Sequence, residues 1–123
     1  FSVITTLSRS VPVLEANLLR YGLDRRCARV RATDIPVLKL EEGDPGVIER
    51  LRTEIRKAID QDGVEAIVLG CAGMTDLMQS LSDEFGLPVV DGVGCAVAFA
   101  EALVRARLST AKLRSYAATD QNR

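Results

Sequence analysis

The sequence has 123 residues with no histidine and only three cysteines, Cys27, Cys71 and Cys95. Without histidine, a Cys-His catalytic dyad cannot form within this chain, and a zinc site of the usual kind lacks its common ligands. The cysteines form no Cys-x-x-Cys pair and are too few for a disulfide framework. We therefore expect no metal centre. An odd cysteine count beside an ordinary core indicates a reducing, cytoplasmic setting.

The sequence also has few aromatic residues, and its positive and negative charges nearly balance. Aromatics make up 4% of the chain and the formal net charge is −1. Because nucleic-acid-binding proteins usually carry a basic stripe and stacking aromatics, we expect no nucleic-acid partner. No apolar stretch approaches the roughly 20 residues of a membrane span, and no signal peptide is visible, so we expect no membrane association. Apolar residues amount to 47%, enough for one compact domain with its own core.

Short apolar runs alternate with amphipathic helical patterns along the chain. The patterns predict strands at residues 1–6, 27–32, 65–69 and 88–90, and helices at residues 12–21, 45–61, 74–85 and 93–104. Ser8 or Ser10 is expected to cap the first helix, and residues 33–44 are expected to form a long loop. Strands that alternate with helices indicate an α/β fold of three layers, with a mainly parallel sheet covered on both faces.

Three loops with small or polar residues follow strands of this predicted sheet. They are Thr5-Thr6, Gly70-Cys71-Ala72-Gly73 and Asp91-Gly92-Val93-Gly94. Because ligands of parallel sheets bind at the carboxyl ends of the strands, we expect the three loops to lie on one edge and to form the site.

The cysteine of the second loop is predicted to stand at the start of a helix. The helix dipole and free backbone amides there favour a thiolate over a thiol, and the amides can also hold the charge of an enolate. The flanking glycines let a substrate approach the backbone closely. The same pattern also fits a structural interpretation, in which Cys71 fills the core, Thr5 and Thr6 end a strand, and the glycines serve the turn. Cys27 and Cys95 are interpreted as structural.

At these residues the chain resembles a known family. "DGVEAIVLGCAGMTDL", followed by "LPVVDGVGCAVAFAEALV", is similar to the C-terminal half of the Asp/Glu/hydantoin racemase superfamily, in its hydantoin and allantoin racemase branch. "FSVITTLSRSVPVLEANLLRYGL" resembles the segment upstream in that branch, so the likeness covers nearly the whole chain. The amino-acid racemase branch usually has Thr-Glu after its second cysteine. Ala72-Gly73 at this position favours a neutral cyclic ureide over an acidic amino acid.

The resemblance implies a mechanism and a set of site residues. Such enzymes need no cofactor, and two cysteines flank the acidic carbon of the substrate from opposite faces. Cys71 matches the second of these cysteines, and no role is transferred to Cys95. The substrate pocket would be lined by the remaining matching positions, which are Thr5, Thr6, Gly70, Ala72, Gly73 and Gly92. The expected substrate is a small cyclic ureide, a 5-substituted hydantoin or allantoin.

The resemblance also implies that the chain is a portion of a two-domain enzyme. Residues 1–88 would form a flavodoxin-like second domain, and residues 89–123 would supply a strand, a helix and a tail that return to a first domain holding the other cysteine. We therefore expect a homo-oligomeric racemase of which this chain alone is incomplete and inactive. Two alternatives stay open: a single-cysteine decarboxylase of the same superfamily, and a non-catalytic α/β module that binds a small molecule. A cysteine in the matching loop of the other domain would indicate the racemase, and a glycine the decarboxylase.

Overall fold

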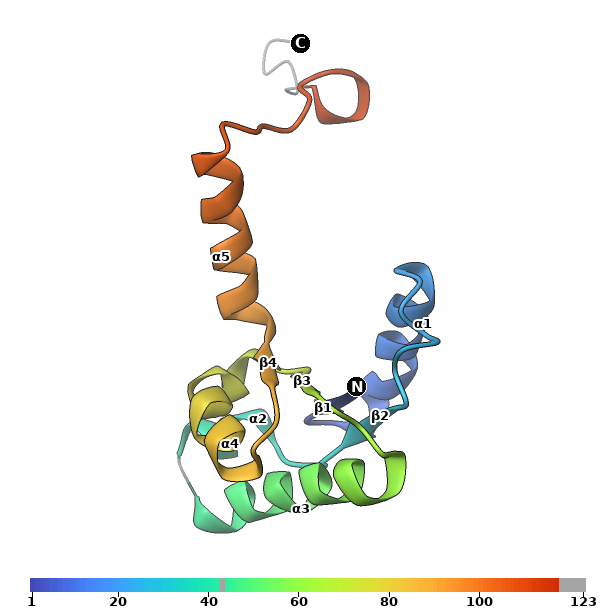
Figure 1. Cartoon of the computed structure of the whole chain (residues 1–123), viewed down its shortest axis with the longest axis vertical. Helices are drawn as coiled ribbons and strands as arrows, with labels where there is room; N and C mark the ends of the chain where they lie inside the picture. Colours follow the sequence, from blue (N-terminus) through green and yellow to red (C-terminus); the bar gives the residue numbers. More distant parts are fainter. Residues whose placement is uncertain (43, 118–123) are drawn as a thin grey trace.

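The computed structural model describes residues 1–42 and 44–117, in which strands and helices alternate along the chain (Figure 1). The final part of the predicted tail, residues 118–123, lies outside the described residues. The elements are β1 (Ser2–Thr5), the 3-10 turn η1 (Ser8–Ser10), α1 (Val11–Arg20), β2 (Arg29–Ala32), α2 (Val37–Glu41), α3 (Pro45–Asp62), β3 (Ile67–Leu69), the 3-10 helix η2 (Ala72–Leu77), α4 (Met78–Phe85), β4 (Val89–Asp91), α5 (Gly92–Arg105) and the 3-10 turn η3 (Arg114–Tyr116).

The strands of the described residues form one parallel sheet in the order β2-β1-β3-β4. In its register Thr5 of β1 pairs with Ala32, and Leu69 of β3 pairs with both Ile4 and Asp91. The predicted α/β fold with a parallel sheet is confirmed, and the strand boundaries differ from the predicted ones by at most two residues. Cys27, which was predicted inside the second strand, precedes β2 instead.

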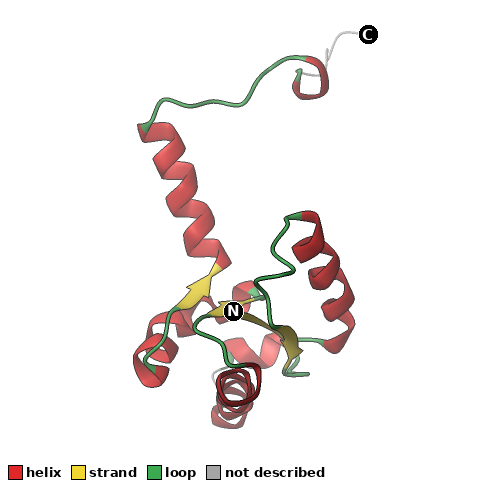
Figure 2. Ribbon diagram, turned by 45° about the vertical axis from the view of Figure 1, so that its right-hand side comes forward, coloured by secondary structure: helices red, strands yellow, loops and turns green. Residues whose placement is uncertain are grey.

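The sheet is covered on both faces, as predicted. Figures 1 and 2 show α1 on one side of the strands, with α3 and α4 on the other. The main core lies on the α3 side, because the apolar residues of one strand face point toward the apolar stripe of α3. Its fully buried members include Ile4, Leu51, Ile55, Ile67 and Met74. No residue of α1 is fully buried, so its face of the sheet is the less enclosed one.

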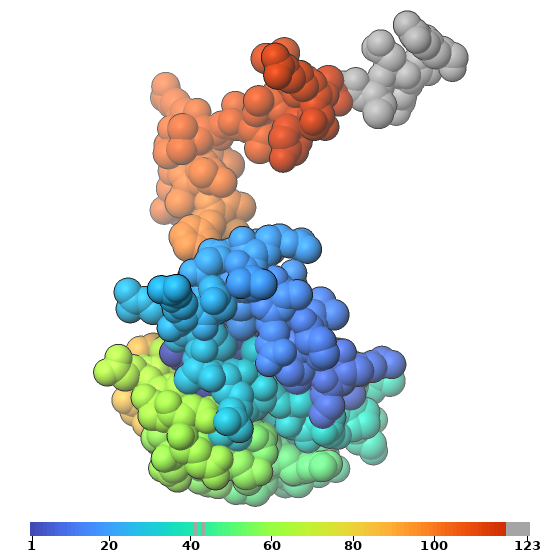
Figure 3. Space-filling view, turned by 90° about the vertical axis from the view of Figure 1, so that its right-hand side faces the viewer, coloured from blue at the N-terminus to red at the C-terminus, as the bar shows by residue number. Residues whose placement is uncertain are grey.

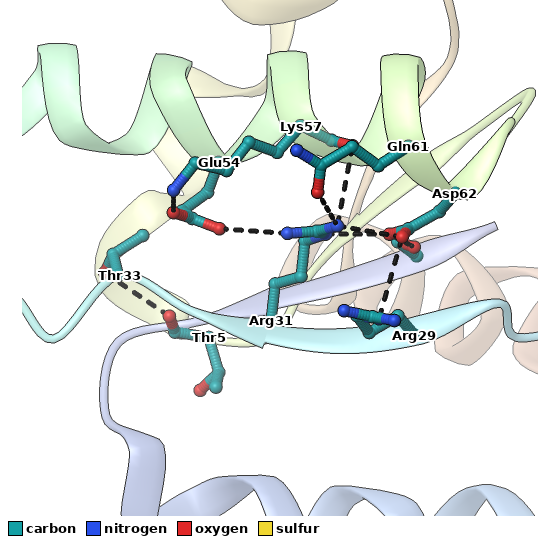
Figure 4. Close-up of polar contacts among 9 residues, drawn as sticks. Thr5, Arg29, Arg31, Thr33, Glu54, Lys57, Gln61 and Asp62 are labelled. Carbon is teal, nitrogen blue, oxygen red and sulfur yellow. Dashed lines mark hydrogen bonds and ion pairs between the residues drawn. The ribbon is translucent and has the colours of Figure 1, made fainter.

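An ion-pair cluster fixes the end of α3 to the sheet. Arg31 points from β2 toward α3, where its Nε lies 2.7 Å from Oδ2 of Asp62 and its side chain is only 8% exposed. Ser2 of β1 donates a second hydrogen bond to Asp62, at 3.0 Å. Glu54 and Gln61 of α3 accept further hydrogen bonds from the Arg31 guanidinium (Figure 4). A buried charge needs such partners, and here they join two neighbouring strands to one helix.

The first two helical predictions need corrections. Neither Ser8 nor Ser10 caps α1, because neither side chain accepts a hydrogen bond from the helix. Ser8 Oγ instead donates to Oδ2 of Asp34 at 2.7 Å, across the gap between the loops that follow β1 and β2. Residues 33–44, predicted as a loop, contain the short helix α2, which contributes the buried Leu40 to the core. Five residues give little helical periodicity in a sequence, and α2 depends on this packing rather than on propensity.

The helix predicted at residues 74–85 is present in two parts. Residues Ala72–Leu77 form a 3-10 helix, and the α-helical part, α4, starts only at Met78. The predicted apolar stripe is buried in the core at Met74 and Leu81. The 3-10 part was not foreseen because apolar spacings of three and four residues fit both helix types over so short a stretch.

The end of the described chain leaves the sheet at Gly92. β4 pairs with β3, so the strand of the predicted 89–123 segment stays in the same sheet as residues 1–88. From there α5 and the following residues run out from the rest of the molecule (Figure 3). Every residue of α5 is exposed, although several are large and apolar, among them Val97, Phe99 and Val104. No helix in the described part is both long and apolar enough to cross a membrane.

Candidate functional site

The three loops predicted to form a site lie at one edge of the sheet. Thr5, Leu69 and Asp91 are the last residues of β1, β3 and β4, and the parallel register brings these strand ends together. The loop after β3 therefore lies between the loops after β1 and β4. This order places the residues around Cys71 at the centre of the edge.

Cys71 lines a small pocket, which we call the Cys71 pocket. Its volume is about 180 Å³, and its walls are the ends of β3 and β4 with the residues that follow them, namely Leu69, Gly70, Cys71, Ala72, Asp91, Gly92 and Val93. Cys71 is half-buried with extended backbone angles, and its side chain also packs against the core cluster. Both earlier interpretations of this cysteine describe part of its environment, since it contacts the core and lines the pocket.

The backbone next to Cys71 carries free donors. η2 begins directly after the cysteine, and its first bond runs from the amide of Met74 to the carbonyl of Cys71 at 3.1 Å. The amides of Ala72 and Gly73 donate to no group among the described residues, as expected in the first turn of a helix. The six-residue 3-10 helix η2 replaces the α-helix that was expected here. The thiol of Cys71 therefore lies at the start of a short 3-10 helix and does not face the dipole of a long α-helix.

Gly70 separates the Cys71 pocket from a second, larger one. We call the second pocket the threonine pocket; its volume is about 420 Å³ and it is lined by Thr5, Thr6, Arg9, Ser10, Val13, Leu14 and Gly70. A side chain at position 70 would bring its Cβ to 3.0 Å from Val3 Cγ1 and 3.3 Å from the carbonyl oxygen of Ile4. Any larger residue would force β1 to shift, so glycine suits this close approach, and it lines both pockets.

Thr5 and Thr6 are held by their backbones. The Thr33 hydroxyl lies 3.4 Å from both of their carbonyl oxygens, and its amide donates to Thr5 at 3.0 Å. The two residues are only 2% and 4% exposed, yet their own hydroxyls have no hydrogen-bond partner among the described residues. No fully buried side-chain oxygen in that part of the chain lacks a partner, so these hydroxyl oxygens are accessible, and both residues line the threonine pocket.

Asp91 organises the wall opposite Cys71, a role that sequence reasoning missed. Its Oδ1 accepts from Thr75 Oγ1 at 2.7 Å and from the Val93 amide at 2.9 Å, and its Oδ2 accepts from the Gly94 amide at 2.7 Å. The Thr75 hydroxyl and the two amides hold the pKa of Asp91 below its usual value, although burial opposes them. An aspartate directly before a glycine and an apolar helical pattern is the N-cap signal that could have predicted the two amide contacts.

The structure distributes the predicted site residues over the two pockets. Gly70, Cys71, Ala72 and Gly92 line the Cys71 pocket, whereas Thr5 and Thr6 share the threonine pocket with Gly70. Gly73 lines neither pocket, but a Cβ at this position would lie 3.8 Å from the sulfur of Cys71. Arg9 and Ser10 line the threonine pocket without having been predicted as site residues, and Asp91 was predicted only as part of the loop after the fourth strand.

The other two cysteines lie elsewhere. Cys27 precedes β2, at the opposite edge of the parallel sheet, where its thiol donates to the carbonyl of Arg29 at 3.4 Å. Burial raises the pKa of Cys27, and its backbone hydrogen bonds only partly offset that effect. Cys95 is exposed on α5 and lines neither pocket. The two pockets therefore contain one thiol, that of Cys71.

Comparisons with known proteins show the family of the chain. The sequence model of the Asp/Glu/Hydantoin racemase family matches residues 1–100. The hydantoin racemase of Rhizobium meliloti is 55% identical over 118 residues, which are 95% of this chain and 48% of that protein. Among solved structures, allantoin racemase from Klebsiella pneumoniae superposes with a TM-score of 0.91 at 40% identity, covering 99% of this chain and 50% of that one. Allantoin racemase from Pseudomonas fluorescens gives a TM-score of 0.85 at 47% identity, covering 100% and 52%. The chain thus spans about half the length of the relatives it matches.

Proposed function

The chain belongs to the Asp/Glu/hydantoin racemase family, and on that premise we propose that it is half of a cofactor-independent racemase of 5-substituted hydantoins or allantoin. The observation that carries the proposal is the placement of Cys71 in a pocket at the carboxyl edge of the sheet, between Gly70 and Gly92. A thiol in that position can reach the carbon of a small ring held in the pocket. The names of the relatives supply the substrate class.

The proposed reaction moves one proton off the ring carbon and another onto it. A thiolate on one face takes the proton from C5, and the electron pair of that C–H bond delocalises into the neighbouring ring carbonyl as an enolate. A thiol on the other face then gives its proton to C5, which inverts the centre and leaves a thiolate behind. Cys71 is one of these two groups. The amides of Ala72 and Gly73, which have no protein acceptor among the described residues, are suited to hold the enolate oxygen.

The second thiol of the proposed pair would come from another domain. Cys27 lies at the wrong edge of the sheet and Cys95 lines neither pocket, so neither is proposed as the partner. We propose that α5 and the residues after it return to that other domain, with the boundary near residue 89. The exposed apolar side chains of α5 support this, because an unpaired apolar helix surface is normally covered in the complete protein. We further propose a cytoplasmic homo-oligomer.

The test uses the complete enzyme in D₂O with a single enantiomer of a 5-alkylhydantoin. Loss of optical activity measures racemisation above the spontaneous rate, and NMR locates the deuterium at C5. We expect Cys71→Ser to lower kcat by more than about 100-fold, as loss of a general acid or base does. Cys27→Ser, which changes a cysteine before β2 that lines neither site pocket and leaves a hydroxyl able to donate to the Arg29 carbonyl, is the matched control and should behave as wild type.

The position of the label separates the candidate mechanisms. With two thiols on opposite faces, deuterium accumulates first in the product enantiomer while recovered substrate keeps its hydrogen. A single-thiol enzyme would label substrate and product alike and would release CO₂ from a suitable malonate. Unchanged racemisation by Cys71→Ser would overturn the proposal, and the absence of any turnover by wild type would favour the non-catalytic binding module.

A further inference from the structure

The threonine pocket has features that the proposed proton transfer does not use. It adjoins the Cys71 pocket at Gly70, so a ligand whose reacting carbon lies near Cys71 can extend past Gly70 into it. It is also the larger of the two, about 420 Å³ against about 180 Å³. The geometry therefore separates a place for the reacting ring from a place for the substituent of that ring.

The buried end of the threonine pocket offers hydrogen-bond donors. Thr5 and Thr6 are nearly buried, and no group among the described residues accepts from or donates to their hydroxyls. Figure 4 shows the Thr5 side chain pointing away from α3, toward the face of the sheet on which α1 lies. Because both hydroxyl oxygens are accessible and have no partner among the described residues, they are free to bond to a ligand in the threonine pocket.

One charged side chain lines this pocket, that of Arg9. Its guanidinium forms no ion pair within residues 1–42 and 44–117. The other ionisable side chain along the joined pockets, apart from Cys71, is Asp91, and its two oxygens are already occupied by Thr75, Val93 and Gly94. Among the residues that line the joined pockets, the exposed Arg9 is therefore the one cation, and it lines the threonine pocket and not the Cys71 pocket.

We propose that Arg9, together with the hydroxyls of Thr5 and Thr6, selects substrates whose ring substituent accepts hydrogen bonds, a carboxylate above a neutral carbonyl. This specificity rests on the proposed racemase function and extends it to the part of the substrate that does not react. A guanidinium binds a carboxylate by two parallel charge-assisted bonds, and it binds a neutral amide or ureide carbonyl more weakly. Leu14, half-buried in the same pocket wall, supplies an apolar contact for the methylene groups between the ring and the acceptor.

The test compares three hydantoins of similar shape in the complete enzyme. Their 5-substituents are 2-carboxyethyl, 2-carbamoylethyl and 3-methylbutyl, so the acceptor changes from charged to neutral to none. Wild type is expected to show the highest kcat/KM for 2-carboxyethyl. In Arg9→Gln the ratio of kcat/KM for 2-carboxyethyl to that for 3-methylbutyl should fall about tenfold or more, as loss of a charged hydrogen bond predicts. The corresponding ratio for 2-carbamoylethyl should fall less, and Arg9→Lys should restore part of the first ratio.

The control is Arg20→Gln, which removes the same charge from an exposed position at the other end of α1. It is expected to leave both ratios unchanged. The proposal is overturned if Arg9→Gln leaves the ratio for 2-carboxyethyl unchanged, or if Arg20→Gln lowers it equally, because the effect would then be one of net charge. Under either of these outcomes, racemisation of the 3-methylbutyl compound by wild type would show that the proposed racemase function still stands. If wild type racemises none of the three, the proposed function fails and this specificity fails with it.

Discussion

The hydroxyl of Thr75 donates to Oδ1 of Asp91 across 2.7 Å, and this bond joins the helix after Cys71 to the first turn of α5. The same carboxylate caps α5 through the amides of Val93 and Gly94. A Cβ at position 94 would lie 2.6 Å from Oδ2 of Asp91, so any residue other than glycine there would require the carboxylate to shift. Asp91 therefore fixes the position of Gly92, in the wall of the Cys71 pocket, relative to Cys71.

The first prediction concerns that bond. Thr75→Ala removes the donor and leaves a nearly buried carboxylate oxygen with one partner fewer, so the variant should unfold at lower urea concentration than wild type. Thr53→Ala is the matched control, because Thr53 is exposed and bonds only to the carbonyl of Glu49 in its own helix. The urea concentration at the midpoint of unfolding should fall clearly more for Thr75→Ala than for Thr53→Ala. Equal shifts in the two variants would mean that the contact to Asp91 does not stabilise the fold.

The second prediction separates two glycines that line the same pocket. Gly70→Ala places a Cβ against Val3 and the backbone of Ile4, and we expect it to lower the free energy of unfolding by about 1–3 kcal/mol, as overpacking does. Gly92→Ala meets no atom within 4 Å, so its stability should stay within about 0.5 kcal/mol of wild type. Urea denaturation measures both. In the complete enzyme Gly92→Ala should nonetheless raise KM, because its methyl group occupies substrate space; an unchanged KM would remove Gly92 from the proposed pocket.

The strands and the site edge could be predicted because local signals were sufficient there. Runs such as residues 66–69 are apolar and include the β-branched Ile67 and Val68, and parallel strands place their carboxyl ends together whatever the strand order is. The contacts of Asp91 with Thr75 and of Arg31 with Asp62 could not be predicted, because their partners are 16 and 31 residues apart and only the folded chain brings them together. α2 was missed for a related reason, since its five residues are helical where Leu40 packs into the core.

The third prediction concerns the ion pair of Arg31 and Asp62. The hydrogen bond from Arg31 holds the pKa of Asp62 below its ordinary value of 3.8. The folded state thus binds this proton less readily than the unfolded state, so the pair stabilises the fold above about pH 3.8 and stops doing so as the pH falls through the lowered pKa. Asp62→Asn should cost about 3 kcal/mol at pH 7, because it leaves a buried guanidinium with only the longer 3.4 Å contact to Glu54 as its counter-charge. The difference from wild type should shrink as the pH drops below 3.8.

Two further variants test that explanation. Asp60→Asn changes an exposed carboxylate of the same helix and should alter the stability little at any pH. Replacing both partners, in the double variant Arg31→Met/Asp62→Leu, should recover much of the stability lost in Asp62→Asn, because no unpaired charge remains buried. Chemical denaturation from pH 3 to pH 7 supplies the data. A deficit of Asp62→Asn that stays constant over this range would contradict an electrostatic origin.

The last prediction follows from the number of thiols at the site. Inverting a carbon centre by the proposed route needs one proton-transfer group on each face of the ring, and the two pockets of this chain contain only Cys71. The chain has no histidine to replace the missing group, and Cys27 stands at the opposite edge of the sheet. Residues 1–123 expressed alone should therefore not racemise a 5-alkylhydantoin above the spontaneous rate in polarimetry. A cooperative thermal transition in circular dichroism, and alkylation of Cys71 by iodoacetamide in a chain carrying Cys95→Ser, would establish that the isolated chain is folded with its thiol accessible. Turnover by this folded chain at the rate of the complete enzyme would show that one thiol is enough, and the two-thiol mechanism would have to be abandoned.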